Sequence, residues 1–301
     1  MFYTPRVRPE YRLEPCTTAL NAVRGMPFRW SLNPYSGCAH RCTFCYVRHF
    51  EQRADRPSGE RYGRSLRVKT NIAEVLRREL ARPSWRREEV AVGTATDPYQ
   101  PAEGRFRLTR ACLAELARAW TPFSLVTRGP LVVRDLDVLQ EAARRVPVRV
   151  YVSLPTLDER VWRTTEPGTA PPRSRLAAVR RLAEAGLEVG VGIAPVLPGL
   201  SDRQEQLEAV VRAARDAGAG AIWASAVHLR PGVREHFLAA LARDWPEQVA
   251  RYQALFALRA YLPGPVARAL TEPVRRAAAS TPAPRREGRI RPVEGQLALA
   301  V

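Results

Sequence analysis

Three of the five cysteines in this 301-residue chain lie within eight positions, at Cys38, Cys42 and Cys45. Their spacing is Cys-x3-Cys-x2-Cys, and no fourth cysteine lies nearby in the sequence. Three thiolates can hold three irons of a cubane [4Fe–4S] cluster and leave the fourth iron without a protein ligand. The spacing therefore predicts an iron–sulfur centre with one open, reactive iron.

Two other interpretations of these cysteines stay open. A zinc site would take His40 or His49 as its fourth ligand, although zinc motifs usually pair a short Cys-x2-Cys knuckle with a second pair downstream. A disulfide would need an oxidising compartment. Residues 1–14 are polar and basic and contain no apolar segment of the secretory type, which disfavours that compartment.

The cysteine spacing, with the aromatic Phe44 just before the last cysteine, resembles the signature of the radical S-adenosylmethionine (radical SAM) superfamily. The resemblance implies that Cys38, Cys42 and Cys45 hold the cluster, that Phe44 lies at the cofactor, and that S-adenosylmethionine (SAM) binds the open iron. It also implies that an electron from the cluster cleaves SAM to a 5′-deoxyadenosyl radical, a chemistry that belongs to the cofactors. An electron donor such as flavodoxin or ferredoxin is then required.

Strands and helices alternate along the chain. Apolar runs predict strands over 28–33, 89–93, 123–127, 148–154, 187–196 and 221–227. Amphipathic patterns predict helices that begin at Thr70 and that span 108–120, 134–144, 173–185 and 202–216. Such alternation implies parallel strands with right-handed crossovers, and six units give a partial (β/α)6 barrel in the α/β class. The radical SAM resemblance implies the same fold.

Four segments are predicted. Residues 1–25 lack periodicity and are predicted to be an irregular basic arm, and residues 26–232 are predicted to form the barrel. Within the barrel, residues 47–70 are predicted to be a structureless basic loop that contacts the substrate. Residues 233–279 are predicted to be a helical extension, with helices over 232–242, 246–262 and 266–279. Residues 280–301, rich in proline and arginine, are predicted to be a disordered basic tail.

The end of the second predicted strand carries the run Gly93-Thr94-Ala95-Thr96-Asp97-Pro98-Tyr99. Catalytic groups in parallel α/β barrels gather at the C-terminal ends of strands. Many radical SAM enzymes have a Gly-Gly-Glu-like segment here that meets the methionine amino group. Gly93, Thr94 and Thr96 match it in place, and Asp97 offers the carboxylate. A rigid turn that Asp97 caps is the competing interpretation.

Later strand ends supply further candidates. The resemblance implies that Ser153 contacts a ribose hydroxyl. It also implies that the adenine lies against the backbone between Gly192 and Pro195, because glycine permits close approach. Two arginines, Arg128 and Arg134, are expected either to contact phosphate or to pair with nearby acids, namely Asp135, Asp137 or Glu141.

Longer stretches narrow the resemblance to the spore photoproduct lyase-like branch, whose members are commonly called DNA repair photolyases. The matching runs are the Asn-Pro-Tyr-x-Gly-Cys around Cys38, 93–103, 127–139, Glu166-Pro167-Gly168 and 193–202. One departure matters: spore photoproduct lyases place a cysteine hydrogen donor at the end of the second strand, and residues 93–96 contain no thiol. Tyr99 is the candidate catalytic replacement for that donor.

The charge of the chain favours a polyanionic partner. The sequence has 48 arginine and lysine residues against 30 aspartates and glutamates, a net charge of +18. We therefore expect a nucleic-acid substrate. Together with this charge, the resemblance to the photolyase-like branch implies repair-like chemistry. Radical modification of a peptide, protein or small metabolite is the first alternative, and a zinc-stabilised nucleic-acid-binding module without catalysis is the second.

Two expectations concern location and partners. No apolar run reaches the roughly 20 residues of a membrane span, so we expect a cytoplasmic protein without membrane contact. The last residues, Gln296-Leu297-Ala298-Leu299-Ala300-Val301, resemble the short glutamine–leucine peptides with which bacterial repair proteins dock on the sliding clamp. This resemblance implies a clamp contact through the C-terminus.

Overall fold

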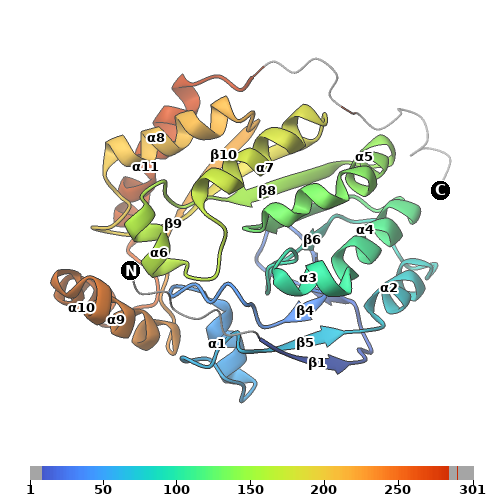
Figure 1. Ribbon diagram of the computed structural model, residues 1–301, viewed down its shortest axis with the longest axis horizontal. Helices are drawn as coiled ribbons and strands as arrows, with labels where there is room; N and C mark the ends of the chain where they lie inside the picture. The colour runs from blue at the N-terminus through green and yellow to red at the C-terminus, as the bar shows by residue number, and fades with distance from the viewer. Residues whose placement is uncertain (1–8, 285–289, 291–301) are drawn as a thin grey trace.

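A seven-stranded sheet forms the centre of the computed structural model, which describes residues 9–284 and residue 290 (Figure 1). The strand order is β10-β9-β8-β7-β6-β3-β2. The six strands from β10 to β3 are parallel, whereas β2 pairs antiparallel with β3 at one edge. The strands are β2 (Leu20–Ala22), β3 (Trp30–Leu32), β6 (Val90–Val92), β7 (Phe123–Thr127), β8 (Val148–Ser153), β9 (Glu188–Val196) and β10 (Ala221–Ala226). The predicted α/β fold with six parallel strands is confirmed.

Helices connect the parallel strands and cover the outer face of the sheet (Figure 1). They are α2 (Ile72–Leu80), α3 (Pro101–Phe106), α4 (Leu108–Arg118), the 3-10 helix η1 (Pro130–Asp135), α5 (Leu136–Arg145), α6 (Glu159–Thr165), α7 (Pro172–Glu184) and α8 (Gln204–Asp216). The five longer α-helices agree with the sequence pattern. The shorter α3 and α6 were not predicted, because six or seven residues hold too few turns for a periodic signal.

The main core lies between the sheet and these helices. In β8 the side chains of Val148, Val150 and Val152 alternate with more exposed residues and all three are buried. They belong to one apolar core with residues of the helices, among them Leu76 of α2 and Leu116 of α4. Burying a valine or leucine side chain contributes about 1.5–3 kcal/mol, so this layer fixes the positions of the strand ends.

The N-terminal segment is more regular than predicted. A second, three-stranded sheet has the order β1-β5-β4, where β1 is Glu10–Glu14, β5 is Ser65–Lys69 and β4 is Tyr35–Ser36. The prediction of an irregular arm is therefore wrong for β1 and β2. No residue of β1 is fully buried and its parallel partner β5 lies far along the chain, so no local alternation marks it as a strand.

The segment 47–70 is likewise not structureless. It forms α1 (Val47–Arg53) and the strand β5, with turns between them. The regular burial of β5, with Leu66 and Val68 inside, is hidden in the sequence by the arginines and the lysine that flank them. The prediction failed because a strand whose buried residues are flanked by charged ones has the same local composition as a basic loop.

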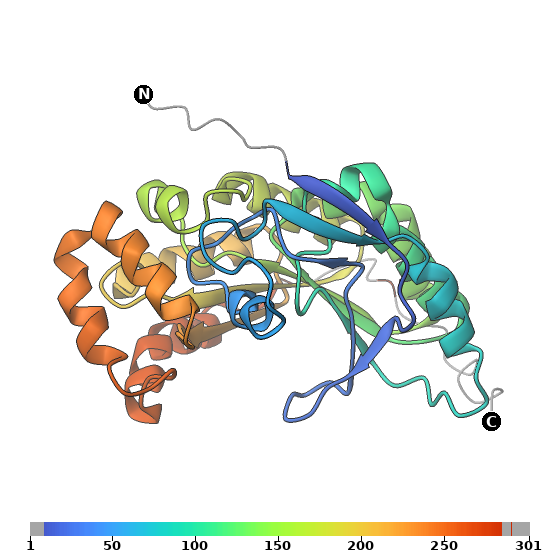
Figure 2. The same cartoon turned by 90° about the horizontal axis from the view of Figure 1, so that it is seen from below.

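The C-terminal extension consists of α9 (Val233–Asp244), the short η2 (Pro246–Gln248), α10 (Val249–Leu255) and α11 (Gly264–Ser280). The α9–α10 pair lies beside the sheet, at lower left in Figure 1 and in orange in Figure 2, whereas α11 packs on α8 and β10. A second apolar core joins the extension to the cysteine loop: Phe237, Tyr252 and Phe256 cluster with Cys42 and Phe44. The extension therefore forms part of the surroundings of the candidate site.

The predicted helix over 246–262 is wrong beyond Leu255. Residues 256–263 form an irregular segment in which Tyr261 makes an isolated β-bridge with His228. The division of the chain at 25, 232 and 279 stays a prediction. Residues 296–301, which resemble a clamp-binding peptide, and most of the predicted tail lie outside the described residues.

No helix in the described part of the chain is both long enough and apolar enough to cross a membrane.

Candidate metal centre and active site

The three cysteines lie in the loop between β4 and α1, shortly after the C-terminal end of β3. This is the strand end at which the sequence placed them. Cys38 and Cys42 are buried, at 7% and 4% exposure, and Cys45 is partly buried. Cys45 Sγ lies 3.6 Å from Tyr62 Oη, which belongs to the segment between α1 and β5. The other two cysteines are elsewhere: Cys112 lies in the main core and Cys16 packs at its edge.

The backbone of the loop is held by the buried side chain of Arg48. This side chain is 1% exposed and its guanidinium lies 4.4 Å from the centroid of the Tyr62 ring. It donates to four backbone carbonyls within 2.7–3.3 Å, those of Arg41, Cys42, Ser58 and Gly59. The sequence indicated that the arginines of this segment contact the substrate. For Arg48 that expectation is wrong, because its hydrogen bonds close the cysteine loop.

Two glycines let other segments approach the loop closely. A Cβ on Gly63, where φ is +72°, would lie 2.2 Å from the Cys38 carbonyl oxygen. A Cβ on Gly168 would lie 2.4 Å from the Ala39 carbonyl oxygen, and the Gly168 N–H donates to the His40 carbonyl at 3.0 Å. The Thr43 N–H donates to the Thr165 carbonyl at 2.8 Å. The loop therefore sits in a cradle that larger side chains would fill.

The thiols fit a bound metal cluster better than they fit a metal-free protein. Burial raises the pKa of the Cys42 thiol to about 12, against which Arg128 acts only in part. Burial, followed by the nearby Asp97, Cys45 and Cys42, raises the pKa of Cys38 well above its ordinary value. Two buried thiolates and a third that is partly buried need a positive partner, and metal coordination supplies one because it deprotonates thiols outright. The donor set therefore suits an iron–sulfur cluster.

The histidines near the loop are engaged with other groups. His40 Nδ1 lies 3.2 Å from Asp97 Oδ2, and His49 Nδ1 lies 3.2 Å from the Pro231 carbonyl oxygen. Within residues 9–284 and residue 290, no three side chains of His, Cys, Asp or Glu are grouped so as to hold a single metal ion.

A buried ion-pair network lies next to Cys42 and Phe44. Glu166 accepts from Arg128 Nε at 2.6 Å and from Arg175 Nη1 at 3.0 Å, and the side chain of Glu166 is 1% exposed. The Arg128 guanidinium lies 5.8 Å from the centroid of the buried Phe44 ring. Burial alone would raise the pKa of Glu166, but Arg175 and Arg128 hold it below its ordinary value.

The sequence missed most of this network. The expectation that Arg128 pairs with Asp135, Asp137 or Glu141 is wrong, whereas Arg134 does pair with Asp135 at 2.7 Å. Glu166 falls in a stretch that matched the family, which could have marked it as a partner. Arg175 stands among several arginines at the start of α7, and nothing local distinguishes it.

The loop after β6 lies against the cysteine loop. Gly93 has φ +88°, and its N–H donates to the Leu32 carbonyl at 3.1 Å. The Thr94 carbonyl accepts from Tyr46 Oη, and Thr94 Oγ1 accepts from Asn33 Nδ2 at 3.4 Å. Thr96 Oγ1 donates to the Gly37 carbonyl at 2.6 Å. These contacts fix the spacing between the ends of β3 and β6.

Asp97 lies at the centre of this junction with both oxygens in hydrogen bonds. Oδ1 accepts from Thr127 Oγ1 at 2.6 Å and from the Tyr99 N–H at 2.9 Å, and Oδ2 accepts from the Arg128 N–H at 2.6 Å. Burial alone would raise the pKa of Asp97, but His40, Thr127 and the Arg128 N–H lower it to about 2. Asp97 is thus a carboxylate that ties β6 to β7, the arrangement of the turn-capping interpretation.

Tyr99 points into the helical layer. Its ring is 2% exposed and belongs to the main core, and its hydroxyl donates to Asp135 Oδ2 at 3.1 Å. Asp135 is also paired with Arg110 and Arg134. The role of Tyr99 as a hydrogen donor stays a prediction, and none of these contacts joins it to the cysteine loop.

The remaining predicted cofactor residues lie at the end of β8 and in the C-terminal half of β9. Ser153 Oγ donates to the Ala194 carbonyl at 3.3 Å, and the same carbonyl accepts from Arg128 Nη2 at 3.2 Å. The Ala194–Pro195 peptide is cis. A Cβ on Gly192 would lie 2.7 Å from the Trp223 ring, so that ring lies directly over the glycine backbone. The structure therefore places Ser153 and Pro195 around one carbonyl that Arg128 also contacts.

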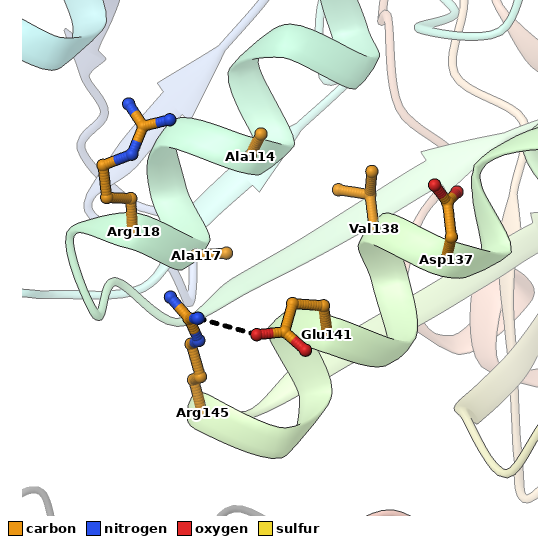
Figure 3. Close-up of a pocket in the computed structure, with 7 residues that line it drawn as sticks. All are labelled: Ala114, Ala117, Arg118, Asp137, Val138, Glu141 and Arg145. Carbon is orange, nitrogen blue, oxygen red and sulfur yellow. Dashed lines mark ion pairs between the residues drawn. The ribbon is translucent and has the colours of Figure 1, made fainter.

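Two surface hollows lie away from these residues. One of about 370 Å³ lies between α4 and α5 and is lined by Ala114, Ala117, Arg118, Asp137, Val138, Glu141 and Arg145 (Figure 3). Its Arg145 pairs with Glu141 at 2.7 Å. The other, of about 330 Å³, lies between α8 and α11. Both are grooves between packed helices and contain no candidate site residue.

A family model and several relatives match this chain. The family model of the Radical SAM superfamily matches residues 32–214. An uncharacterized protein of Mycobacterium tuberculosis (strain ATCC 25618 / H37Rv) is 45% identical over 251 residues, which cover 82% of this chain and 74% of that protein. An uncharacterized protein of Acidianus two-tailed virus is 32% identical over 213 residues, which cover 67% of this chain and 68% of that protein.

Solved structures share the fold. A spore photoproduct lyase mutant superposes with a TM-score of 0.69 at 14% sequence identity, over 90% of this chain and 79% of that one. A mutant of the same enzyme with bound AdoMet and dinucleoside spore photoproduct gives a TM-score of 0.68 at the same identity and coverage. At this identity the likeness establishes the fold alone.

Proposed function

Because this chain belongs to the radical SAM superfamily, we propose that it generates a 5′-deoxyadenosyl radical and uses it on a nucleic acid, in a reaction of the lesion-repair type. The protein is a radical SAM enzyme, and its cofactors are a [4Fe–4S] cluster and SAM. When bound, the cluster supplies the electron for reductive cleavage of SAM. The observation that carries the proposal is the three-cysteine loop at the end of β3.

The chain's own residues prepare this site. Cys38, Cys42 and Cys45 are the ligands that would hold three irons, and Arg48 fixes the loop that presents them. The network of Arg128, Glu166 and Arg175 carries a net charge of +1. A buried positive charge beside thiolates stabilises their negative charge. Phe44 and the second apolar core exclude water from one side of the loop.

The carbonyl of Ala194 is a candidate contact for the cofactor. It accepts from Ser153 Oγ and Arg128 Nη2, and the Trp223 ring covers the neighbouring backbone at Gly192. We retain Ser153, Gly192 and Pro195, together with Gly93, Thr94, Thr96 and Asp97, as proposed cofactor-binding residues. Asp97 acts in this proposal through its control of the junction between β6 and β7.

Charge and fold support a nucleic-acid substrate. The net charge of +18 suits a polyanion, and exposed arginines at positions 53, 61 and 64 follow the cysteine loop. A protein of the same fold, spore photoproduct lyase, has been solved with a dinucleoside spore photoproduct. A peptide or protein substrate is the alternative that the experiment below separates.

The test is anaerobic formation of 5′-deoxyadenosine by the reduced, reconstituted protein. The assay contains no substrate, intact DNA, ultraviolet-irradiated DNA or a mixture of peptides. We expect cleavage in wild type and in the control Cys16→Ala, whose site lies outside the loop, and none in Cys42→Ala. Stimulation by irradiated DNA alone supports repair. Stimulation by peptides and not by DNA refutes the substrate proposal, and absence of cleavage from a fully loaded cluster refutes the radical step.

A further inference from the structure

Four aromatic side chains and one arginine form an exposed surface next to the cysteine loop, which we call the aromatic platform. Its members are Tyr46, Phe50, His228, Tyr261 and Arg230. The rings of His228 and Tyr261 stack with centroids 5.0 Å apart and an interplanar angle of 15°. Tyr46 continues the row at 5.8 Å from His228, and Phe50 meets Tyr46 edge-on at 6.0 Å. These separations are those of interacting aromatic rings.

The platform is exposed although its rings are large. Tyr46 is 38% exposed, Phe50 is 44% exposed and Tyr261 is 53% exposed. Most other aromatic rings of the described chain lie in one of the apolar cores or at its edge. Several exposed aromatic side chains that touch one another mark an interaction site more often than scattered ones do.

Specific contacts hold the rings in place before any ligand arrives. Tyr46 Oη donates to the Thr94 carbonyl. Tyr261 is fixed by its β-bridge to His228, and the adjoining Leu229 N–H donates to the Ala260 carbonyl at 2.7 Å. Arg230 Nη2 donates to Tyr261 Oη at 2.9 Å. A preorganised surface of this kind loses little conformational entropy on binding.

The position of the platform connects it to the reactive centre. Tyr46 directly follows Cys45 in the loop that comes after β3, the first parallel strand. His228 comes shortly after β10, the sixth parallel strand. These strands are the two ends of the parallel row, which does not close into a ring. The platform therefore spans the open side of the partial barrel, where the C-terminal ends of strands present catalytic groups.

The chemistry of the platform matches an unstacked nucleobase with its phosphate. Proteins that bind single-stranded nucleic acid combine aromatic rings, on which bases stack, with arginines that contact the backbone. Arg230 lies 5.7 Å from the Tyr261 ring centroid, so charge and ring are adjacent. Burial, followed by Arg230, lowers the pKa of His228, so this ring is a neutral stacking partner at neutral pH.

We propose that the aromatic platform stacks an unpaired nucleobase of the substrate on Tyr261 while Arg230 contacts the adjoining phosphate. This proposal rests on the proposed nucleic-acid substrate and adds the residues that would recognise it. A base presented here is displaced from its duplex, as enzymes that perform chemistry on bases require.

The test measures binding of the reconstituted holoenzyme to a fluorescein-labelled 12-nucleotide single-stranded DNA by anisotropy. A strand of the same length in which the central nucleotides are abasic separates base contacts from backbone contacts. The variants are Tyr261→Ala, Tyr261→Phe and Arg230→Gln. Leu258→Ala, at a side chain 93% exposed in the same segment, and Arg180→Gln, at an exposed position of α7, are the controls. SAM binding is measured in parallel by equilibrium dialysis.

We expect Tyr261→Ala to weaken binding of the base-containing strand about tenfold and to leave binding of the abasic strand unchanged. Tyr261→Phe keeps the ring and loses the hydrogen bond from Arg230, so it should still bind the base-containing strand more tightly than the abasic strand. Leu258→Ala should bind as the wild type does. Arg230→Gln should reduce the salt dependence of binding by about one phosphate contact, and Arg180→Gln should not.

If Tyr261→Ala binds each strand as tightly as the wild type does, the proposed role of the platform is overturned. The proposed nucleic-acid substrate still stands in that case, because the wild type binds DNA. If the wild type binds neither strand, the nucleic-acid substrate fails as well. Loss of SAM binding in Tyr261→Ala, with DNA binding unchanged, would also overturn the proposal, because it would assign the platform to the cofactor.

Discussion

Arg175 Nη1 donates to Glu166 Oε2 at 3.0 Å, and the two side chains are 0% and 1% exposed. The same carboxylate also accepts from Arg128 Nε at 2.6 Å. A buried carboxylate between two guanidinium groups neutralises charges that have little access to water. Its removal leaves those charges uncompensated, which costs more than the pair itself contributes.

We expect Glu166→Gln to lower the free energy of unfolding by about 3 kcal/mol or more, because it strands the charges of Arg128 and Arg175 in the interior. Urea unfolding of anaerobically purified protein measures this change. Glu141→Gln is the control, because Glu141 pairs with Arg145 at the surface and is 50% exposed. The control should lose less than about 1 kcal/mol. Equal losses in the two variants would contradict a special role for the buried pair.

Arg48→Lys should weaken iron retention although it preserves charge. A lysine cannot reach the four carbonyls that the guanidinium joins, so the cysteine loop loosens. Iron release to a chelator under anaerobic conditions should be roughly tenfold faster, the factor expected from the net loss of one or two hydrogen bonds. Arg53→Lys, at an exposed position at the end of the same helix, should release iron at the wild-type rate. Identical rates in all three proteins would show that Arg48 does not restrain the loop.

The cysteine loop and the alternation of strands and helices could be predicted from the sequence because both signals are local. Three cysteines in eight positions can be recognised without knowledge of distant residues. The alternation of buried and more exposed residues in Val148–Ser153 is likewise visible in the sequence of that strand alone. The hydrogen bonds of Arg48 to the cysteine loop could not be predicted in this way. An arginine on a short helix in a basic segment has the same local pattern whether it is solvated or buried, and only the packing of Tyr62 over it decides.

Gly63→Ala should destabilise the protein much more than Gly25→Ala does. Both glycines have nearly the same backbone conformation, φ +72° and φ +73°, so the cost of a left-handed alanine, about 1–2 kcal/mol, is common to both. A Cβ at position 63 meets the Cys38 carbonyl oxygen at 2.2 Å, whereas a Cβ at position 25 has no neighbour within 4 Å.

The steric difference should appear as a further loss on the order of 2 kcal/mol or more in urea unfolding, since displaced backbone belongs to the large-effect classes of mutation. Gly63→Ala should also lower the iron content after reconstitution, because the displaced carbonyl belongs to Cys38, one of the three proposed cluster ligands. If both variants lose the same stability and keep the same iron, then the loop tolerates displacement and the cradle does not constrain it.

His236 should make the protein less stable as the pH falls from about 6.5 to about 4. Burial, followed by Arg48, Arg243 and Arg41, lowers its pKa from 6.5 to about 4. Between these values the unfolded chain binds a proton that the native chain does not, so the free energy of unfolding decreases as the pH decreases. Below about pH 4 this contribution is fully lost.

Denaturant midpoints at pH 7 and pH 5 measure the effect. His236→Gln removes the titrating group and should lose less stability between the two pH values than the wild type does. His49→Gln, which alters another histidine of this region, serves for comparison. Parallel pH profiles of the wild type and His236→Gln would refute the assignment.

The parts of the fold that the sequence missed depend on partners far along the chain. The pairing of β1 with β5 joins residue 10 to residue 65. Each strand is rich in charged residues, so its own sequence does not predict a strand. The pairing of Arg128 with Glu166 also joins residues far apart in the sequence. The nearer Asp135 forms ion pairs with other arginines instead. Local patterns identify which elements form, whereas long-range packing decides which side chains meet.

The second apolar core links the packing of the cysteine loop to the C-terminal part of the chain. Cys42 and Phe44 near the N-terminus share that core with Phe237, Tyr252 and Phe256 of the C-terminal extension. On the ribosome, where N-terminal segments emerge first, the cysteine loop therefore waits for nearly the whole chain before it can acquire its final packing. A product that ends before the extension would therefore leave Cys42 without this packing and its thiol more accessible to oxidation.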